Sequence, residues 1–389
     1  MNFELKENKL IISLEGRIDS NTSNDIENDI TKIINDNSFE QLVLGFENVE
    51  FLSSAGLRVI LRLKKKYNNL SVINVVPEVY DVFEMTGFTE MMDIQKGFRK
   101  LSIEGAEEIG RGANGIVYRY ANDMIVKVYF NNAALEDIRN EIRLAKKAFV
   151  SGVSTAIPFD IVKVGQYYGS VFEMIQAQSI SKLINKHPEK IDEYISLLVE
   201  LLKTMNSNVV EDGSLPTIKD KAIRWIDTIK DFLSADELTK LNNLFNGIPN
   251  DNFMVHRDYH IKNLLMQQDE LILIDMDTLS RGSVIFELVG IYNAYKGFVE
   301  IKEPGEPDFL GIDNETSYYI WNKILELYFD DKSKEELQII EEKISLVSTV
   351  QLLKIHTNKS KNIVAKERKA AELERKLHYL INKVNDLVL

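Results

Sequence analysis

Three polar residues in the second half of the chain have the types and the spacing that a phosphate-transfer site needs. Asp258 is followed five positions later by Asn263, and Asp275 stands just after the next apolar run. A carboxylate can accept or orient the proton of a hydroxyl group, and carboxylate and amide oxygens are ligands that suit Mg²⁺. The pattern predicts phosphoryl transfer, with Asp258 as the catalytic residue and Asn263 and Asp275 as metal ligands.

A glycine-rich segment upstream has the pattern that would hold the donor of the phosphate. Its missing side chains let backbone N–H groups approach phosphate oxygens, and a valine follows the last glycine. The residues predicted to bind the nucleotide here are Gly110, Gly112, Gly115 and Val117.

A lysine and a glutamate are expected to complete the grip on the nucleotide. Lys127 lies in the middle of an apolar run and is predicted to hold the α- and β-phosphates. Its expected partner on the following helix is Glu141, which falls within the apolar period of that helix, and Glu136 is the second choice. Residues 173–176 are the expected hinge, where the backbone around Met174 would meet the adenine.

Each of these signals also has an ordinary structural explanation. A single G-x-G-x-x-G is often a plain turn, and one lysine in an apolar strand often only extends its ammonium group to water. Asp258 and Asn263 are both residue types that favour turns. Five elements in the order and approximate spacing that one fold requires favour the phosphotransferase interpretation over these separate explanations.

The segment from His256 to Asn263, followed by Ile274 and Asp275, resembles the motif of the aminoglycoside phosphotransferase and choline kinase-like group. That group shares the protein-kinase fold and phosphorylates small molecules. The resemblance covers roughly residues 100–389. It implies ATP and Mg²⁺ as cofactors and a small-molecule hydroxyl group as acceptor.

Individual letters of the motif bear on the choice between kinase branches. His260 stands where protein kinases usually carry lysine, and it acts either directly or by bracing the loop. Arg257, by contrast, is the residue that protein kinases carry at this position. Asp277 replaces the glycine of the D-F-G motif, and it either assists the metal or braces the loop.

The first hundred residues follow a different pattern. Strand-like runs alternate with helical patterns, which predicts an α/β sandwich. The expected strands are Leu10–Leu14, Leu42–Leu44 and Ser71–Val75, and the expected helices are Ile26–Ile34, Ala55–Tyr67 and Glu78–Met85.

Residues 49–61 resemble the STAS domain of bacterial anti-sigma factor antagonists, and residues 14–19 and 79–88 fit the outline of that family. A loop serine is phosphorylated by a partner kinase in that family, and Ser54 falls on its position. Ser53 replaces an acidic residue that is common there. The resemblance implies a regulatory protein partner, although either serine could instead only cap the helix expected from Ala55.

The length suits two domains, because 389 residues are too many for one compact domain. We expect a STAS-like α/β domain at residues 1–97 and a bilobal protein-kinase-like α+β domain at residues 101–389. The small lobe would span about 101–175 and the large, mostly helical lobe about 176–389.

Composition excludes several other classes of protein. A net charge of −13 argues against general nucleic-acid binding, and the absence of cysteine excludes disulfides. No leader sequence and no apolar run long enough to span a membrane is evident, so we expect a cytoplasmic protein without membrane attachment. Two alternatives stay open: a bacterial protein Ser/Thr kinase in a partner-switching pathway, and a nucleotide-sensing pseudokinase.

Overall fold

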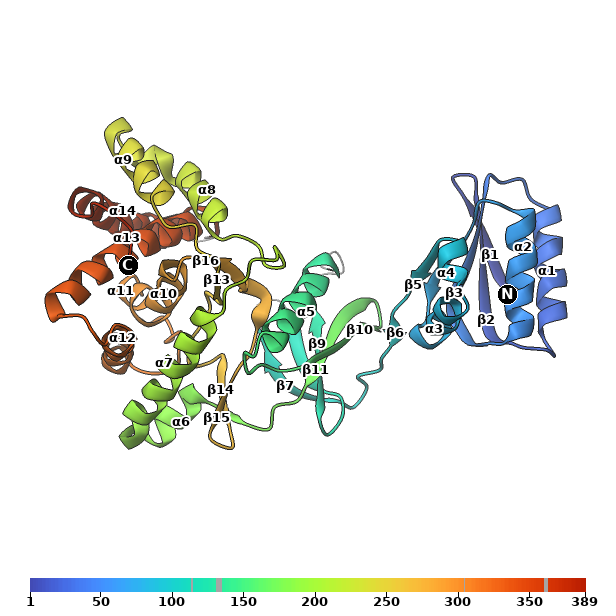
Figure 1. The fold of residues 1–389 in the computed structure, drawn as a ribbon, viewed down its shortest axis with the longest axis horizontal. Coiled ribbons are helices and arrows are strands. Elements are labelled where there is room, and N and C mark those ends of the chain that lie inside the picture. Colours follow the sequence, from blue (N-terminus) through green and yellow to red (C-terminus); the bar gives the residue numbers. More distant parts are fainter. Residues whose placement is uncertain (113–114, 131–134, 304, 360–362) are drawn as a thin grey trace. The chain divides into compact units, whose positions relative to one another are not determined.

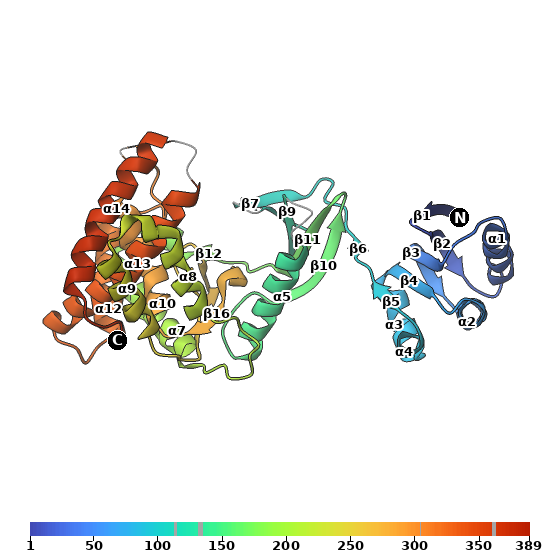
Figure 2. The same cartoon turned by 90° about the horizontal axis from the view of Figure 1, so that it is seen from above.

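The structure is a computed structural model that describes residues 1–112, 115–130, 135–303, 305–359 and 363–389. These residues form two compact units. The first unit contains residues 1–120, 125–135 and 160–171, and the second contains residues 121–124, 136–159 and 172–389. Figure 1 labels the helices and strands, and Figure 2 shows them after a quarter turn.

A five-stranded sheet in the order β1-β2-β3-β4-β5 organises the N-terminal hundred residues. β1 runs antiparallel to β2, whereas β2 to β5 run parallel to one another. The strands are β1 Asn2–Lys6, β2 Lys9–Ile18, β3 Gln41–Leu52, β4 Leu70–Val75 and β5 Ile94–Lys96; the helices are α1 Ser23–Asn35, α2 Ser54–Lys66, α3 Pro77–Met85 and α4 Phe88–Met91.

The expected strands and helices of this part are all present, and β2 and β3 are longer than predicted. Alternate residues of β2 are buried, as a half-covered strand requires. Helices α1 and α2 lie side by side (Figure 1). The core of this domain includes Phe46 on β3, Phe83 on α3 and Phe88 on α4, and the rings of neighbouring pairs lie 5.7 and 5.8 Å apart between centroids.

A second sheet has six strands in the order β6-β10-β11-β9-β8-β7. Its strands are β6 Arg99–Lys100, β7 Glu107–Arg111, β8 Gly115–Arg119, β9 Met124–Tyr129, β10 Pro158–Val164 and β11 Tyr167–Glu173. β7, β8 and β9 are antiparallel neighbours. Helix α5, Leu135–Val150, lies between β9 and β10 in the chain and is the helix expected to carry Glu141.

Helices make up most of the second unit, as predicted. The helices are α6 Ile180–Lys186, α7 Ile191–Ser207, α8 Lys219–Ile229, α9 Ala235–Asn246, α10 Ile285–Tyr292, α11 Phe298–Glu300, α12 Asn314–Tyr328, α13 Lys334–Lys359 and α14 Ile363–Lys383. The short strands are β12 Gln178–Ser179, β13 Phe253–Val255, β14 Leu264–Gln267, β15 Glu270–Leu273 and β16 Ser280–Gly282.

The core of the second unit buries aromatic side chains completely. Tyr292, Tyr295 and Trp321 are 1, 0 and 0 % exposed, so these rings serve packing. The long helices α13 and α14 lie side by side in both views (Figures 1 and 2). Over the ranges that the structure describes, no helix is long and apolar enough to cross a membrane.

Gly56 allows α2 to pack closely against β2 and β3, and this contact yields a stability prediction. A Cβ atom at Gly56 would lie 2.6 Å from Leu52 Cδ1 and 2.8 Å from the backbone oxygen of Ile18. We expect Gly56→Ala to destabilise the N-terminal domain by about 1–3 kcal/mol, the usual effect of overpacking. Amide hydrogen exchange in α2 and β3 would measure the loss.

The exposed neighbour Arg58 provides the control for this substitution, because Arg58→Ala should leave the exchange in α2 and β3 almost unchanged. Both tryptophans, Trp225 and Trp321, belong to the second unit. Their fluorescence therefore reports whether that unit unfolds as before. Unchanged exchange in Gly56→Ala would mean that the backbone can relax at this contact.

Candidate active site

The predicted catalytic residue Asp258 lies in a loop that leaves strand β13. One carboxylate oxygen, Oδ2, accepts a hydrogen bond of 2.9 Å from the side-chain amide of Asn263, and the other, Oδ1, lies 3.3 Å from Nε2 of His260. The side chain remains 41 % exposed. Asp258 is thus held on both oxygens while it stays accessible to a reacting molecule.

His260 contributes to the charge of Asp258 as well as to its position. Burial opposes the negative charge of Asp258, but the hydrogen bond and electrostatic attraction from His260, together with the hydrogen bond from Asn263, outweigh burial and lower the pKa of Asp258. Asp258 is therefore a carboxylate at neutral pH. The bracing role and the direct role considered for His260 are compatible in this geometry.

A β-hairpin brings Asp275 next to Asn263. Strands β14 and β15 pair antiparallel, with Leu264 opposite Leu273, and the backbone N–H of Ile274 donates to the carbonyl of Asn263 at 2.9 Å. Asp275 follows in the left-handed conformation, with φ of 68°, and its side chain is exposed. Asp258, Asn263 and Asp275, separated by up to 17 positions, thus gather at one end of this hairpin.

Asp277 lies two residues beyond Asp275 in a single 3₁₀ turn, Met276–Thr278. Met276 between the two aspartates is buried, whereas both aspartates are exposed. Thr278 in the same turn donates its hydroxyl hydrogen to the carbonyl of His256 at 2.6 Å. Thr278 thereby joins the turn to the catalytic loop, and the role of Asp277, either at the metal or in bracing the loop, stays a prediction.

A buried glutamate that the sequence analysis did not single out anchors the catalytic loop. Glu287 on α10 is 0 % exposed, and its Oε2 accepts hydrogen bonds from the backbone N–H groups of His256 and Arg257, the latter at 3.0 Å. Arg257 has φ of 69° and donates from its guanidinium to the carbonyl of Thr278 at 2.7 Å. One glutamate within an otherwise apolar helix was the signal in the sequence that could have identified it. Glutamate is almost never fully buried unless it has partners, so such a residue indicates a buried contact.

Burial also changes the ionisation of two groups behind Asp258. It lowers the pKa of His256 to about 4, so the buried imidazole is neutral and its Nδ1 accepts from the backbone N–H of Asp258 at 3.3 Å. Burial raises the pKa of Glu287 to about 7, although the backbone N–H groups of Arg257 and His256 favour the carboxylate.

The glycine-rich segment lies in the first unit and is mostly strand. Gly110 closes β7 with Arg111, Gly115 begins β8, and Gly110 pairs with Val117 across the two strands. The connection between the strands is therefore short, and its residues 113 and 114 lie outside the described residues. The antiparallel pairing extends the two strands into the glycine-rich segment.

Gly115 and Gly112 have different surroundings. A Cβ atom at Gly115 would lie 2.3 Å from the carbonyl oxygen of Val128, so this glycine is required by the pairing with β9. A Cβ at Gly112 would meet no atom within 4 Å. The side of Gly112 is therefore open, but its backbone N–H already donates to the carbonyl of Gly115 at 3.0 Å, so a phosphate here would need another donor.

The remaining predicted nucleotide contacts occupy different elements. Lys127 lies in the middle of β9, opposite Val117, and Glu141 is buried on α5. Lys127 belongs to the first unit and Glu141 to the second, and their pairing stays a prediction. The backbone N–H of Met174 donates to the carbonyl of Asp123 at 2.8 Å, so this N–H is already used and a contact with adenine would need another group.

In the N-terminal domain, the two adjacent serines have different positions. Helix α2 begins at Ser54 and not at Ala55 as expected, and Ser53 is its cap, since Ser53 Oγ accepts from the N–H groups of Ala55 at 3.2 Å and Gly56 at 3.5 Å. The side chain of Ser54 is exposed in the first turn. The capping role therefore falls to Ser53.

The site combines an accessible carboxylate, that of Asp258, with the amide of Asn263 and the carboxylate of Asp275. This combination is typical of phosphotransferases. Comparison with known proteins agrees. The profile of the phosphotransferase enzyme family matches residues 105–301, half of the chain, and the profile of the STAS domain matches residues 1–101. The chain belongs to the phosphotransferase enzyme family and carries an N-terminal STAS domain.

Individual relatives resemble one part of the chain each. An anti-sigma F factor antagonist of Paenibacillus polymyxa is 32 % identical over 89 residues, which are 22 % of this chain and 76 % of that protein. An ADP-bound aminoglycoside phosphotransferase, APH(2'')-Ib, aligns with 14 % identity over 77 % of this chain and 98 % of its own, with a TM-score of 0.49. An amicoumacin kinase in complex with AMP-PNP and Ca²⁺ aligns with 13 % identity over 77 % and 93 %, with a TM-score of 0.47.

The family matches confirm the predicted fold class, a STAS-like α/β domain followed by a kinase-like fold, and the predicted enzyme class, an ATP-dependent phosphotransferase. They also confirm both resemblances seen in the sequence.

The buried carboxylate of Glu287 generates a prediction on the pH dependence of stability. Its folded-state pKa of about 7 lies above the ordinary value of 4.5. The stability that it contributes is therefore fully present below pH 4.5 and is lost as the pH rises through about 7. We expect this loss to be on the order of 3 kcal/mol. His256, whose lowered pKa of about 4 makes stability rise with pH over nearly the same range, offsets the loss in the wild type alone. The loss is therefore measured as a difference from a variant that keeps His256, by urea unfolding followed by tryptophan fluorescence.

The variant Glu287→Gln isolates this contribution, because the amide can accept a hydrogen bond but does not titrate. Its free energy of unfolding should be lower than that of the wild type at pH 5 by about 1–3 kcal/mol, and this difference should disappear or reverse as the pH rises from 4.5 to 7. The surface variant Glu335→Gln, on the exposed first turn of α13, is the control. An identical pH slope in Glu287→Gln and the wild type would contradict the prediction.

Proposed function

We propose that this enzyme transfers the γ-phosphate of ATP to a hydroxyl group of a small molecule, and that its STAS domain regulates it. The observation that carries the proposal is the cluster of Asp258, Asn263 and Asp275 at one end of the β14–β15 hairpin, with Asp258 held by Asn263 and His260. Such a cluster offers one group for the acceptor and two for metal-bound phosphate.

The proposed step forms one bond and breaks one. The acceptor oxygen attacks the γ-phosphorus, the bond between that phosphorus and the bridging oxygen breaks, and ADP leaves. The proton of the hydroxyl group goes to Asp258. Because its pKa is lowered, Asp258 is a weak base, and we infer that it mainly orients the hydroxyl and takes the proton late in the reaction.

Mg²⁺ fits the residues that would hold it. The side-chain amide of Asn263 donates to Asp258 through Nδ2, and its side-chain oxygen Oδ1 accepts no hydrogen bond from the described residues and suits a cation. Asp275 is an exposed carboxylate. No group of three or more His, Asp or Glu side chains in the described ranges could hold a metal alone. This suits Mg²⁺, which is usually held by one or two carboxylates together with phosphates, and which would neutralise the γ-phosphate when bound.

Lys127 would hold the α- and β-phosphates and Glu141 would orient it. Gly110, Gly112, Gly115 and Val117 would cover the phosphates, and the open side of Gly112 would leave room for them. Positioning and charge neutralisation supply most of the catalysis in phosphoryl transfer.

A small-molecule acceptor is favoured by two features. His260 contacts Asp258 at the position where protein kinases usually carry a lysine. In addition, no Ala-Pro-Glu segment follows Asp275, and protein kinases use that segment to organise a peptide-binding surface.

A second candidate function is phosphorylation of a protein, and Ser54 is the observation that favours it. Ser54 is exposed in the first turn of α2, and Ser53 already caps the helix. A phosphate at Ser54 would be stabilised by the N-terminal end of the helix dipole. We propose that Ser54 is the switch position of the STAS domain and that it alters binding of a regulatory protein of the anti-sigma-factor type.

The roles of Asp258 and Lys127 are separable by experiment. Asp258→Ala should lower phosphate transfer by about 10²–10⁴-fold while calorimetry with Mg-ATP finds nearly unchanged affinity, because Asp258 would touch the acceptor and not the nucleotide. Lys127→Ala should instead weaken nucleotide binding. Full transfer activity in Asp258→Ala would contradict the assignment.

The variant Asp269→Ala is a matched control, since this aspartate lies in the exposed turn of the β14–β15 hairpin and outside the proposed site.

The kind of acceptor can be identified by adding the enzyme and radiolabelled ATP to a cell extract and locating the label. Label on metabolites supports the small-molecule function. Label on protein alone supports the second candidate.

Phosphorylation of Ser54 is testable in protein purified from its native cells. Mass spectrometry should find phosphate on Ser54, and Ser54→Asp should change partner binding or transfer rate relative to Ser54→Ala. Both variants should keep the fold, because Ser53 provides the cap. An unmodified Ser54, with both variants indistinguishable from wild type, would leave Ser54 without a regulatory role.

A further inference from the structure

One π-helical turn, Asn293–Gly297, follows α10 and carries Tyr295. The hydrogen bonds of a π-helix span five residues instead of four, and such turns are rare in proteins but frequent at functional sites. Tyr295 is 0 % exposed, and its hydroxyl oxygen accepts a hydrogen bond of 3.1 Å from the backbone N–H of Ile261. The unusual turn therefore contacts the catalytic loop directly.

Ile261 lies between the two residues that hold the carboxylate of Asp258. His260 contacts one carboxylate oxygen and Asn263 donates to the other. The N–H of Ile261 is buried, and a buried N–H without a partner costs free energy. Tyr295 thus supplies the bond that fixes the backbone between these two contacts.

Glu287 and Tyr295 belong to one continuous helical stretch, α10 followed by the π turn, and both contact the catalytic loop. In a straight α-helix, a residue eight positions later is rotated by about 80° around the axis. The π turn takes up an additional residue and reduces this rotation. One helical stretch can therefore hold the loop at two places, before Asp258 through Glu287 and after it through Tyr295.

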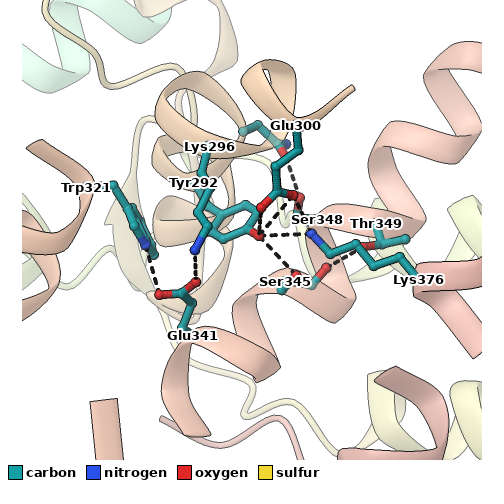
Figure 3. A network of polar contacts seen from close by, with 10 residues as sticks. Tyr292, Lys296, Glu300, Trp321, Glu341, Ser345, Ser348, Thr349 and Lys376 are labelled. Atoms are coloured by element: carbon teal, nitrogen blue, oxygen red, sulfur yellow. Dashed lines mark hydrogen bonds and ion pairs between the residues drawn. The ribbon is translucent and has the colours of Figure 1, made fainter. Parts of the chain in front are cut away.

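Lys296, the residue after Tyr295, joins the π turn to two other helices (Figure 3). It forms an ion pair with Glu341 on α13, and the second carboxylate oxygen of Glu341 accepts from Nε1 of Trp321 on α12 at 3.2 Å. The side chains of Lys296 and Glu341 are only 25 and 16 % exposed. Loss of one partner from an ion pair that is largely buried is costly, so this contact holds the turn in place.

Two hydrogen bonds fix the π turn from other sides. Ser317 on α12 donates to the backbone carbonyl of Tyr295 at 2.7 Å. Tyr292, directly before the turn, accepts from Lys376 on α14 at 3.0 Å (Figure 3). The hydroxyl of Tyr295 therefore has a fixed position beneath the catalytic loop.

We propose that Tyr295 is a positioning residue of the phosphoryl transfer and acts on Asp258 through the backbone of Ile261. Its hydroxyl, placed by the π turn, keeps His260 and Asn263 within reach of the two carboxylate oxygens. The inference rests on the proposed function, because it needs Asp258 to be the group that orients the acceptor hydroxyl. Such positioning matters for the rate, since a misplacement of about 1 Å can slow a reaction by about 10²-fold.

The test compares Tyr295→Phe, which removes only the hydroxyl group, with the wild type in the full-length protein. Label from radiolabelled ATP is followed into a small-molecule filtrate of a bacterial extract. At saturating Mg-ATP, the rate of transfer should fall about ten- to a hundredfold. In calorimetry, the affinity for Mg-AMP-PNP should stay within about twofold and the stoichiometry should not change. Amide hydrogen exchange at Ile261 should become faster.

Tyr328→Phe is the matched control. Tyr328 on α12 donates its hydroxyl hydrogen to the side chain of Asn206 at 3.0 Å, outside the catalytic loop. This variant should lose a similar free energy of unfolding in urea but keep a transfer rate within about twofold of the wild type. In the Asp258→Ala background, Tyr295→Phe should lower the residual rate by less than about twofold, because its effect passes through Asp258.

The outcomes distinguish this inference from the proposed function. A wild-type transfer rate in Tyr295→Phe, while Asp258→Ala has lost transfer, overturns the role of Tyr295 alone. An equal fall of the rate in the wild-type and Asp258→Ala backgrounds, or a reduced stoichiometry of nucleotide binding, shows a merely structural role and overturns it too. No label on any small molecule with the wild-type protein, or equal label with Asp258→Ala, overturns the proposed function and this inference with it.

Discussion

The carboxylate of Glu287 is the interaction on which the geometry of the catalytic loop depends. Two consecutive backbone N–H groups, those of His256 and Arg257, point at one buried oxygen. That arrangement requires a sharp turn, and Arg257 makes it with a positive φ that a residue with a side chain rarely adopts. A conformation of this kind persists only where the surroundings fix it, and here a buried acceptor and the contact from Arg257 to Thr278 do so. The turn directs Asp258 outward.

Much of this architecture could be predicted from the sequence because it depends on local pattern. The alternation in β2 and the helical period of α2 arise from neighbouring residues, and the apolar run before Asp275 is the strand β15. The extent of the strands was less predictable. Gly110 and Gly115 belong to strands because β7, β8 and β9 pair, and pairing between strands is not a local property.

Other features depend on contacts between distant residues and left little trace in the pattern. Glu287 acts on residues about thirty positions earlier, and only its presence in an apolar helix distinguishes it. Phe309 looks like any surface aromatic until the fold brings it to His260. The choice between Ser53 and Ser54 as the cap depends on where α2 begins, and helix ends are the positions that sequence patterns define least well.

The family match ends at residue 301, and the segment that presents Phe309 begins there. The residues proposed for phosphoryl transfer all lie in the matched stretch, and the residues after position 301 form a second stretch. The second stretch is secured by ion pairs to α14, which can be rearranged by substitutions at its surface. Substitutions in the second stretch can therefore change the surface beside His260 while they leave the residues proposed for phosphate chemistry unaltered.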